Sequence, residues 1–361
     1  MSAKLREYTD PGKDVYDAMI DDFEEGMDTE TIDRIFEELK TGLVPLVKAI
    51  AKKDIKLNPK FNRKYGVEPQ RRLQQELLSY IGFDWSQGAV GETEHPFTTG
   101  IIRFDVRVSN HFREDDAIDP MFSAIHEGGH AIFMQNVSPE LAGTAGDDCC
   151  YMGIHESQSR FFENILGRRK SFWKPIYAKV QELLPEYEDI SIDEFYREIN
   201  RVEPSLIRIM ADEVTYCLHI IIRYEIEKAI FREGVAVEEL PNLWNSKMEE
   251  YLGVVPSNDA EGILQDMHWS DGSFGYFPSY LLGSVYDGMF LDELESEMGN
   301  VDDILADGRI KDITHWLNEK IHKYGSTRLP AQVIEEVCHK PISAQPLLRY
   351  FTEKYSKIYE L

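Results

Sequence analysis

Long apolar runs are absent from this sequence, and cysteines are few. No stretch reaches the roughly 18 consecutive apolar residues that a membrane-spanning helix requires, and residues 1–7 are too polar for the hydrophobic core of a secretory signal. The four cysteines (Cys149, Cys150, Cys217 and Cys338) show no C-x-x-C spacing, and the adjacent pair is a poor candidate for a disulfide. These absences predict a reduced, cytoplasmic protein without a membrane partner.

Positive charge is also scarce: 39 Lys and Arg stand against 65 Asp and Glu, so the formal net charge is −26. Such a surface would repel the phosphates of nucleic acids and the anionic headgroups of membranes, so neither is an expected partner. Internal repeats, low-complexity tracts and long linkers are missing as well. We therefore expect one domain over residues 1–361, in which two lobes can enclose a cleft.

Helical periodicity dominates what is present. Apolar residues at 32, 35, 36 and 39 follow the i, i+3, i+4, i+7 pattern, with Asp28 or Thr29 as the cap. A second helix is expected over 69–81, with Pro69 in its first turn and its end before Gly82. Further helices are predicted over 119–136, 155–168, 173–184, 192–200, 204–233, 238–252, 278–297, 311–323, 330–338 and 343–357.

The most informative segment is His-Glu-Gly-Gly-His at residues 126–130, an H-E-x-x-H motif within an apolar, helix-compatible run. His126 and His130 share one helix face, where two imidazoles can hold one zinc ion, and Glu127 can reach a metal-bound water. The alternative is a helix with two partly exposed histidines and a solvated glutamate. The two glycines each cost about 1 kcal/mol in a helix interior, so close approach of a ligand or another backbone is expected to compensate.

Glu156 is the candidate third ligand, because catalytic zinc sites keep three protein ligands and leave one position for water. After His130 the chain passes through a turn-rich stretch at 143–148 and resumes an apolar pattern at 161–166. A loop followed by a second helix can therefore bring Glu156 back to the metal. The alternative is a glutamate that interacts only with the first turn of its own helix.

Three other segments are ambiguous when taken singly. Residues 98–109 alternate and are rich in β-branched side chains, which predicts a strand in a small hairpin or sheet, placed before the H-E-x-x-H helix. Arg208 and Asp212 lie four residues apart, which suits a plain ion pair within a helix. Residues 262–280 are dense in glycine, aromatic residues, histidine and aspartate, which predicts a structured loop.

Together and in this order, these segments resemble the M32 family of metallocarboxypeptidases, from about residue 11 to the end of the chain. Ser109 stands where the family usually has threonine and keeps the hydroxyl. The resemblance implies a mainly α, zincin-like helical metallopeptidase with a small β-strand element beside the active-site cleft. Family members usually carry a further N-terminal helical region that helps roof the cleft, and we expect this chain to lack it. The matching motifs are His95-Pro96-Phe97, Asp105-Val106-Arg107-Val108-Ser109, His126-Glu127-Gly128-Gly129-His130, His155-Glu156-Ser157, Ile207-Arg208-Ile209-Met210-Ala211-Asp212 and Gly262-Ile263-Leu264-Gln265-Asp266-Met267-His268-Trp269.

The resemblance also implies roles for these residues. His126, His130 and Glu156 would bind Zn²⁺, for which Co²⁺ or Mn²⁺ can substitute at such a site. Glu127 would be the general base that deprotonates the zinc-bound water and then passes the proton to the leaving amine. By similarity to zinc peptidases of the angiotensin-converting-enzyme type, His268 and Tyr276 are candidate donors to the oxyanion. The alternative for Tyr276 is an ordinary loop aromatic.

A carboxypeptidase must also recognise a free C-terminal carboxylate, and the planar guanidinium fork matches a carboxylate with two hydrogen bonds. Arg107 and Arg208 are the two arginines inside the matching motifs, and Gln265 can add a donor. Asp105, Asp212 and Asp266 are better interpreted as groups that orient histidine or arginine side chains, and His155 can act in the same way.

The predicted activity is therefore that of a zinc-dependent carboxypeptidase of broad specificity, which acts on peptides with a free C-terminus. One alternative is a zinc oligopeptidase or endopeptidase with a cleft open at both ends. Another is a non-catalytic peptide-binding protein, although a binder has no need of a base such as Glu127. The resemblance further implies a homodimer.

Overall fold

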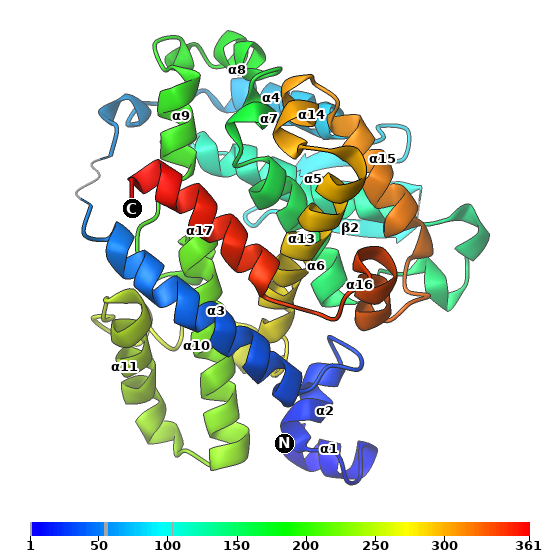
Figure 1. Ribbon diagram of the computed structural model, residues 1–361, viewed down its shortest axis with the longest axis vertical. Helices are drawn as coiled ribbons and strands as arrows, with labels where there is room; N and C mark the ends of the chain where they lie inside the picture. Colours follow the sequence, from blue (N-terminus) through cyan, green and yellow to red (C-terminus); the bar gives the residue numbers. More distant parts are fainter. Residues whose placement is uncertain (1, 54–56, 103, 150) are drawn as a thin grey trace.

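The computed structural model describes residues 2–53, 57–102, 104–149 and 151–361 and is mainly helical, as predicted (Figure 1). The longer helices are α3 (Thr29–Ile50), α4 (Val67–Ile81), α5 (Ile118–Gln135), α10 (Glu213–Lys228), α11 (Leu240–Leu252), α13 (Phe277–Met298) and α17 (Gln345–Tyr359). The shorter ones are α1 (Ser2–Thr9), α2 (Val15–Asp21), α6 (Met152–Arg160), α7 (Lys170–Trp173), α8 (Tyr177–Leu183), α9 (Ile192–Ile199), α12 (His268–Asp271), α14 (Val301–Ala306), α15 (Ile310–Lys320) and α16 (Pro330–Cys338).

Helix α13 is central. It is buried on every side, with Leu282, Val285, Tyr286 and Phe290 inaccessible to solvent, which is the pattern of a helix enclosed by others. Helices α6, α10, α16 and α17 pack against it, and Figure 1 shows α17 crossing in front of it. The core therefore surrounds α13, and its first turns lie next to α6.

A three-stranded sheet lies beside α5. Its strands are β1 (Gly88–Glu92), β2 (Phe97–Ile102) and β3 (Asp105–Asn110), in the order β1-β3-β2. Strand β1 runs parallel to β3 and β2 runs antiparallel to it, so β2 is an edge strand. The single strand predicted over 98–109 is thus a hairpin of two strands, and the short β1 was not predicted.

Several predicted helix boundaries are wrong. The helix expected over 204–233 begins only at Glu213, because the Asp212 carboxylate accepts the N–H groups of Val214 and Thr215 and caps α10. Residues 204–212 form a loop with a single 3₁₀ turn, so the ion pair expected between Arg208 and Asp212 within one helix does not exist. The helix expected over 173–184 begins only at Tyr177, as α8, because Trp173 is the last residue of α7 and Pro175 lies between the two helices.

Two other predicted helices end in a π-helical segment. Helix α6 passes directly into a π-helix at Phe161–Leu166, and α10 passes into one at Ala229–Glu233. At the start of α3, the Asp28 side chain accepts the N–H of Thr31, which settles the choice of cap.

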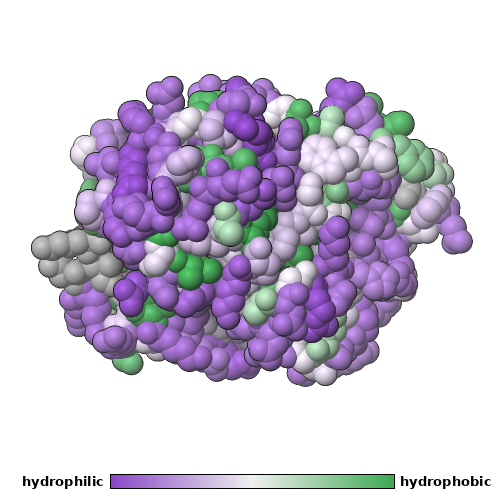
Figure 2. All heavy atoms as spheres, turned by 90° about the horizontal axis from the view of Figure 1, so that it is seen from above, coloured by the Kyte–Doolittle hydropathy of each residue, from purple (hydrophilic) through white to green (hydrophobic). Residues whose placement is uncertain are grey.

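The molecular surface agrees with the polar composition. Figure 2 shows a largely hydrophilic face with hydrophobic residues in small groups. Among the described residues, no helix has both the length and the apolar composition to cross a bilayer. Cys217 and Cys338 are buried thiols, whereas Cys150 lies outside the described residues.

Candidate functional site

Helix α5 carries the H-E-x-x-H motif. His126 and His130 lie one turn apart, with ring centroids separated by 4.9 Å. Before them the Asp116 carboxylate accepts the N–H groups of Ile118 and Asp119 and so starts the helix. The two imidazoles therefore point to the same side of α5, as the spacing predicted.

The two glycines of the motif allow neighbouring elements to approach α5. A Cβ atom on Gly129 would lie 2.6 Å from the main-chain oxygen of Gln158 in α6. A Cβ atom on Gly128 would lie 2.6 Å from the Cδ1 atom of Ile81 in α4. The close backbone approach that the sequence suggested is thus present, and it brings α6 against α5.

This approach places Glu156 of α6 opposite the two histidines. Its Oε2 atom is 3.9 Å from Nε2 of His126 and 3.6 Å from Nε2 of His130. One ligand atom from each of the three residues lies within 4.8 Å of the other two. Two imidazole nitrogens and one carboxylate oxygen around one point are a donor set that fits a divalent metal with a coordination position left open.

The Nδ1 atom of each imidazole, on the side of the ring away from the candidate metal position, also forms a hydrogen bond. The Glu163 Oε2 atom is 2.8 Å from Nδ1 of His126, an arrangement that orients metal-binding histidines in many proteins. Burial would raise the pKa of Glu163, but its hydrogen bond to His126 and the charge of Arg168 lower it to about 2. Glu163 was not predicted as a site residue, although its distance of seven residues from Glu156 places both on one side of a helix.

His130 is held by another histidine, because its Nδ1 atom is 2.5 Å from Nδ1 of His155. Burial lowers the pKa of His155 to about 4, so this ring is neutral at physiological pH. One Nδ1 must therefore donate and the other accept. His155 thus orients His130, as was suggested for its motif.

Glu127 lies on the same turn of α5 and is buried, with 8% of its surface exposed. Burial raises the pKa of its carboxyl group, and this effect outweighs the opposing influence of the His126 charge and of a hydrogen bond from Thr98. The Thr98 hydroxyl, from strand β2, lies 2.7 Å from Oε2 of Glu127. Thr98 was not predicted as a site residue.

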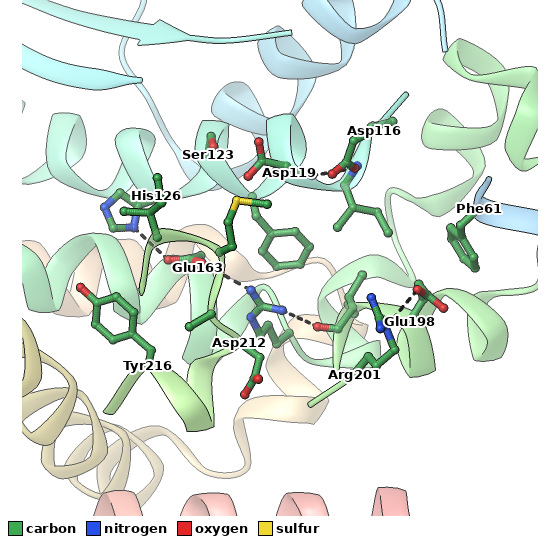
Figure 3. A pocket seen from close by; sticks show the side chains of 18 of the residues that line it. Phe61, Asp116, Asp119, Ser123, His126, Glu163, Glu198, Arg201, Asp212 and Tyr216 are labelled. Atoms are coloured by element: carbon green, nitrogen blue, oxygen red, sulfur yellow. Dashed lines mark hydrogen bonds and ion pairs between the residues drawn. The ribbon is translucent and has the colours of Figure 1, made fainter. Parts of the chain in front are cut away.

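A cavity of about 910 Å³ opens beside this cluster, and His126, Glu127 and Glu156 form part of its wall. Figure 3 shows the residues that line it along α5, from His126 past Ser123 towards Phe61. A cavity of this size is typical of sites for small ligands.

Arg208 forms a cationic part of the cavity wall. The Asp266 carboxylate bridges Arg208 and Arg223, at 2.9 Å from Nε of Arg208 and 2.6 Å from Nε of Arg223. Two guanidinium groups thus share one carboxylate, which leaves one positive charge without compensation. Burial lowers the pKa of nearby His219 well below its usual value, so this histidine adds no charge.

Gln265 contacts Arg208 but is not among the residues that line the cavity. Its Oε1 atom accepts hydrogen bonds from the main-chain N–H of Arg208, at 2.8 Å, and from the Arg223 side chain, at 2.9 Å. Its Nε2 group donates to main-chain oxygens, among them that of Leu206 at 3.0 Å. Gln265 therefore fixes the Arg208 loop.

Arg107 lies away from the cavity. Successive side chains of a strand point to opposite faces, and Val106 and Val108 of β3 are buried in the core, so Arg107 faces solvent. Its guanidinium forms two hydrogen bonds with Asp105, both 2.8 Å long. The structure does not bring it together with the three candidate metal ligands.

His268 and Tyr276 lie next to each other behind the cavity wall. His268 Nε2 is 3.0 Å from the hydroxyl oxygen of Tyr280, and the rings of Tyr276 and Tyr280 lie 4.7 Å apart. Of the three, only Tyr280 lines the cavity. Burial, aided by the Arg208 charge, lowers the pKa of His268 to about 4 and keeps it neutral. Tyr280 was not predicted, although it follows Tyr276 by one turn at the start of α13.

Two buried glutamates join the N-terminal segment to the elements of the site. Glu24 accepts the N–H of Gly153 at the start of α6 and the hydroxyl of Tyr286, at 2.9 and 2.7 Å. Glu227 accepts hydrogen bonds from Tyr16 and from Trp269, beside His268, both at 2.7 Å. Burial raises the pKa of each glutamate to about 7.

A family described as carboxypeptidase Taq (M32) metallopeptidase matches residues 1–355. Carboxypeptidase 1 of Bacillus subtilis is 46% identical over 348 residues, which cover 96% of this chain and 70% of that protein. Thermostable carboxypeptidase 1 of Thermus thermophilus is 39% identical over 350 residues, or 97% of this chain and 69% of that protein. The crystal structure of an M32 carboxypeptidase from Deinococcus radiodurans R1 superposes with a TM-score of 0.97 at 32% identity and covers 100% of this chain and 73% of that chain.

Proposed function

The chain belongs to the carboxypeptidase Taq (M32) family of metallopeptidases and is a metallocarboxypeptidase, and on that premise we propose how it works. His126, His130 and Glu156 hold a zinc ion, Glu127 is the general base, and Arg208 binds the C-terminal carboxylate of the peptide. The observation that carries this proposal is one cavity whose wall holds His126 and Glu156 of the candidate metal site, Glu127, and the incompletely compensated guanidinium of Arg208.

The family implies a divalent metal, and we propose that it is zinc. Two histidines and one glutamate with an open position are a donor set of catalytic zinc sites. When bound, the metal supplies Lewis acidity and lowers the pKa of a water molecule towards neutrality. Co²⁺ or Mn²⁺ can substitute, because ligands of this type accept several metals.

Glu127 handles the proton. It lies between the two histidines on the same turn of α5, so its carboxylate is in position to accept a proton from the attacking water. The same carboxyl group then donates that proton to the amine that leaves when the peptide bond breaks. Burial keeps bulk water away from this carboxylate, so the proton is retained between the two steps.

Arg208 fixes which bond is cut. Asp266 and Tyr216 contact only part of its five N–H donors. The remaining donors are available to a carboxylate that enters the cavity, and the unbalanced positive charge attracts it. A peptide anchored by its terminal carboxylate presents its last peptide bond to Glu127, which gives carboxypeptidase specificity.

Tyr280 is the proposed donor to the oxyanion of the tetrahedral intermediate, because its residue lines the cavity. His268 accepts from or donates to its hydroxyl at 3.0 Å and so orients it. Tyr276 packs against the same ring. In this arrangement the two residues predicted from the sequence act through Tyr280.

The test uses pairs of peptides that are identical except for a free or amidated C-terminus. The zinc-loaded protein is expected to release residues one at a time from the free peptide only. The Glu127→Gln variant, with the same zinc content, is expected to release none. Equal cleavage of both peptides would identify an endopeptidase, and binding without cleavage would identify a peptide-binding protein.

A further inference from the structure

Thr98 makes a contact that the mechanism has not used. Its hydroxyl oxygen is 2.7 Å from Oε2 of Glu127 and 2.9 Å from the main-chain oxygen of the same residue. Among the residues that the structure describes, no other side chain forms a hydrogen bond with the Glu127 carboxylate. The orientation of this buried carboxylate therefore depends on one hydroxyl group.

The backbone of strand β2 is itself fixed at this point. The Ser109 hydroxyl in β3 donates to the main-chain oxygen of Phe97 at 3.1 Å and accepts the N–H of Phe97 at 3.0 Å. It also accepts a hydrogen bond from Thr93 at 2.7 Å. These bonds hold the residue before Thr98, so a chain of contacts runs from the sheet through Thr98 to Glu127.

We propose that Thr98 is the positioning residue of the general base. This inference rests on the proposed role of Glu127. The Thr98 hydroxyl donates its hydrogen to Oε2, because a hydrogen bond to a charged oxygen is stronger than one to the main-chain oxygen. Oε2 is then occupied as an acceptor, so Oε1 is the oxygen that receives the proton from water and returns it to the leaving amine. The bond from Thr98 persists in both steps.

Thr98→Val tests this role, because valine keeps the β-branched shape and the strand preference but removes the hydroxyl. We expect kcat to fall about 10- to 100-fold, the range for a misplaced general base or a lost hydrogen bond to a charged group. The KM is expected to stay within about twofold, since Thr98 does not touch the carboxylate anchor. Thr98→Ser restores the hydroxyl and should recover kcat to within about threefold of the parent.

Thr99→Val is the matched control. Thr99 is the next residue of β2 and is exposed, so the same chemical change occurs on the opposite face of the strand. All variants are compared at equal zinc content and after their melting temperatures are measured. A crystal structure of the zinc-loaded Thr98→Val protein adds a readout independent of activity, in which the Glu127 carboxylate is expected to turn away from its parent position.

Three results would overturn the proposal: full kcat in Thr98→Val, equal impairment of Thr98→Ser and Thr98→Val, or an unmoved Glu127 carboxylate in the variant. A different result would contradict the proposed role of Glu127 as the general base. An active Glu127→Gln variant would remove the base itself, whatever the Thr98 variants do.

Discussion

At the scale of single residues, Arg208 is the residue of the proposed site whose charge is least compensated. It is buried, with 8% of its surface exposed, and shares its only carboxylate partner among the described residues with Arg223. A buried cation without full compensation raises the free energy of the empty site. In the proposed role of Arg208, a bound carboxylate would remove that imbalance, so substrate binding and charge neutralisation would occur together.

Replacement of Arg208 by alanine is expected to lower kcat/KM on peptides with a free C-terminus by about 100- to 1,000-fold, the effect of losing a desolvated charge pair. The Arg107→Ala variant serves as the comparison, because Arg107 is exposed and paired with Asp105. It should retain kcat/KM within about twofold. A larger loss in Arg107→Ala than in Arg208→Ala would reverse the assignment of the carboxylate anchor.

Glu163→Gln probes the support of His126. Glutamine keeps an acceptor for Nδ1 but loses the charge, so the imidazole becomes a weaker and less ordered ligand. Zinc affinity is expected to fall about 10- to 100-fold, as for other residues that hold metal-binding histidines. Competition with a chelator measures this directly, and an unchanged affinity would show that the 2.8 Å contact is not needed for metal binding.

Of the three candidate ligands, the two histidines were predicted to lie together from local geometry alone, whereas Glu156 was expected there only because a catalytic zinc site needs a third ligand. Four-residue spacing on one helix is enough to join His126 to His130. The choice between Arg107 and Arg208 is not local, because it depends on which side of β3 faces the core and on how the loop before α10 folds. Thr98 was missed for the same reason, since only the pairing of β2 with β3 brings it to Glu127.

At the scale of elements, the contact between α5 and α6 determines whether the three ligands meet. Glu156 belongs to α6, whereas the two histidines belong to α5. Its position relative to them therefore depends on how closely the two helices pack. Gly129 lies where the α6 backbone is nearest. The separation of the helices is therefore set by the absence of a side chain at this position.

Gly129→Ala is expected to weaken zinc binding, because a Cβ at 2.6 Å from a main-chain oxygen forces α6 to move. The loss of stability should be about 1–3 kcal/mol, as for other overpacked sites. Gly128→Ala is the matched change one residue earlier, where the Cβ meets the ends of flexible Ile81 and Leu78 side chains. Its effects on zinc affinity and on urea unfolding should be smaller, and equal effects would argue against backbone contact as the cause.

Elements were predicted well where one apolar stripe runs through a whole helix, as in α5. The loop at 204–212 was misread because its apolar residues continue the pattern of α10, although Asp212 favours a helix start. Ile209 and Met210 are exposed, by 67% and 57%. Their apolar character reflects the cavity rim and not a buried helix face, a distinction that periodicity does not make.

At the scale of the whole molecule, the first 30 residues belong to the same structural unit as the site. Glu24 and Glu227 connect them to α6 and to the loop around Trp269, and Phe23 stacks on Tyr276 with ring centroids 4.8 Å apart. The connecting role of Glu24 could not be predicted from the sequence, because a buried glutamate in this acidic segment cannot be told from the exposed glutamates and aspartates around it. The homodimer and the cytoplasmic location stay predictions, and sedimentation measurements would test the former.

Stability should depend on pH through these two glutamates. The pKa of Glu24 is about 7 in the folded protein and near 4.5 in the unfolded chain, so the folded state binds more protons between these values. Its contribution is therefore fully present below pH 4.5 and is lost as pH rises through 7. In Glu24→Gln, the melting temperature should fall less between pH 5.5 and 8 than in the parent, and Glu227→Gln should behave alike. An unchanged pH dependence in both variants would mean that neither carboxyl group is protonated at pH 5.5.

The two glutamate contacts also constrain the order in which the protein can form. Tyr16 and Glu227 are separated by 211 residues, and Glu24 and Tyr286 by 262. Contacts of such high sequence separation form slowly, because a long loop must close before they stabilise anything. During synthesis from the N-terminus, the segment that carries Tyr16 and Glu24 must wait until most of the chain has left the ribosome. The attachment of this segment to α6 and to the loop around Trp269 is thus expected to be a late event in folding.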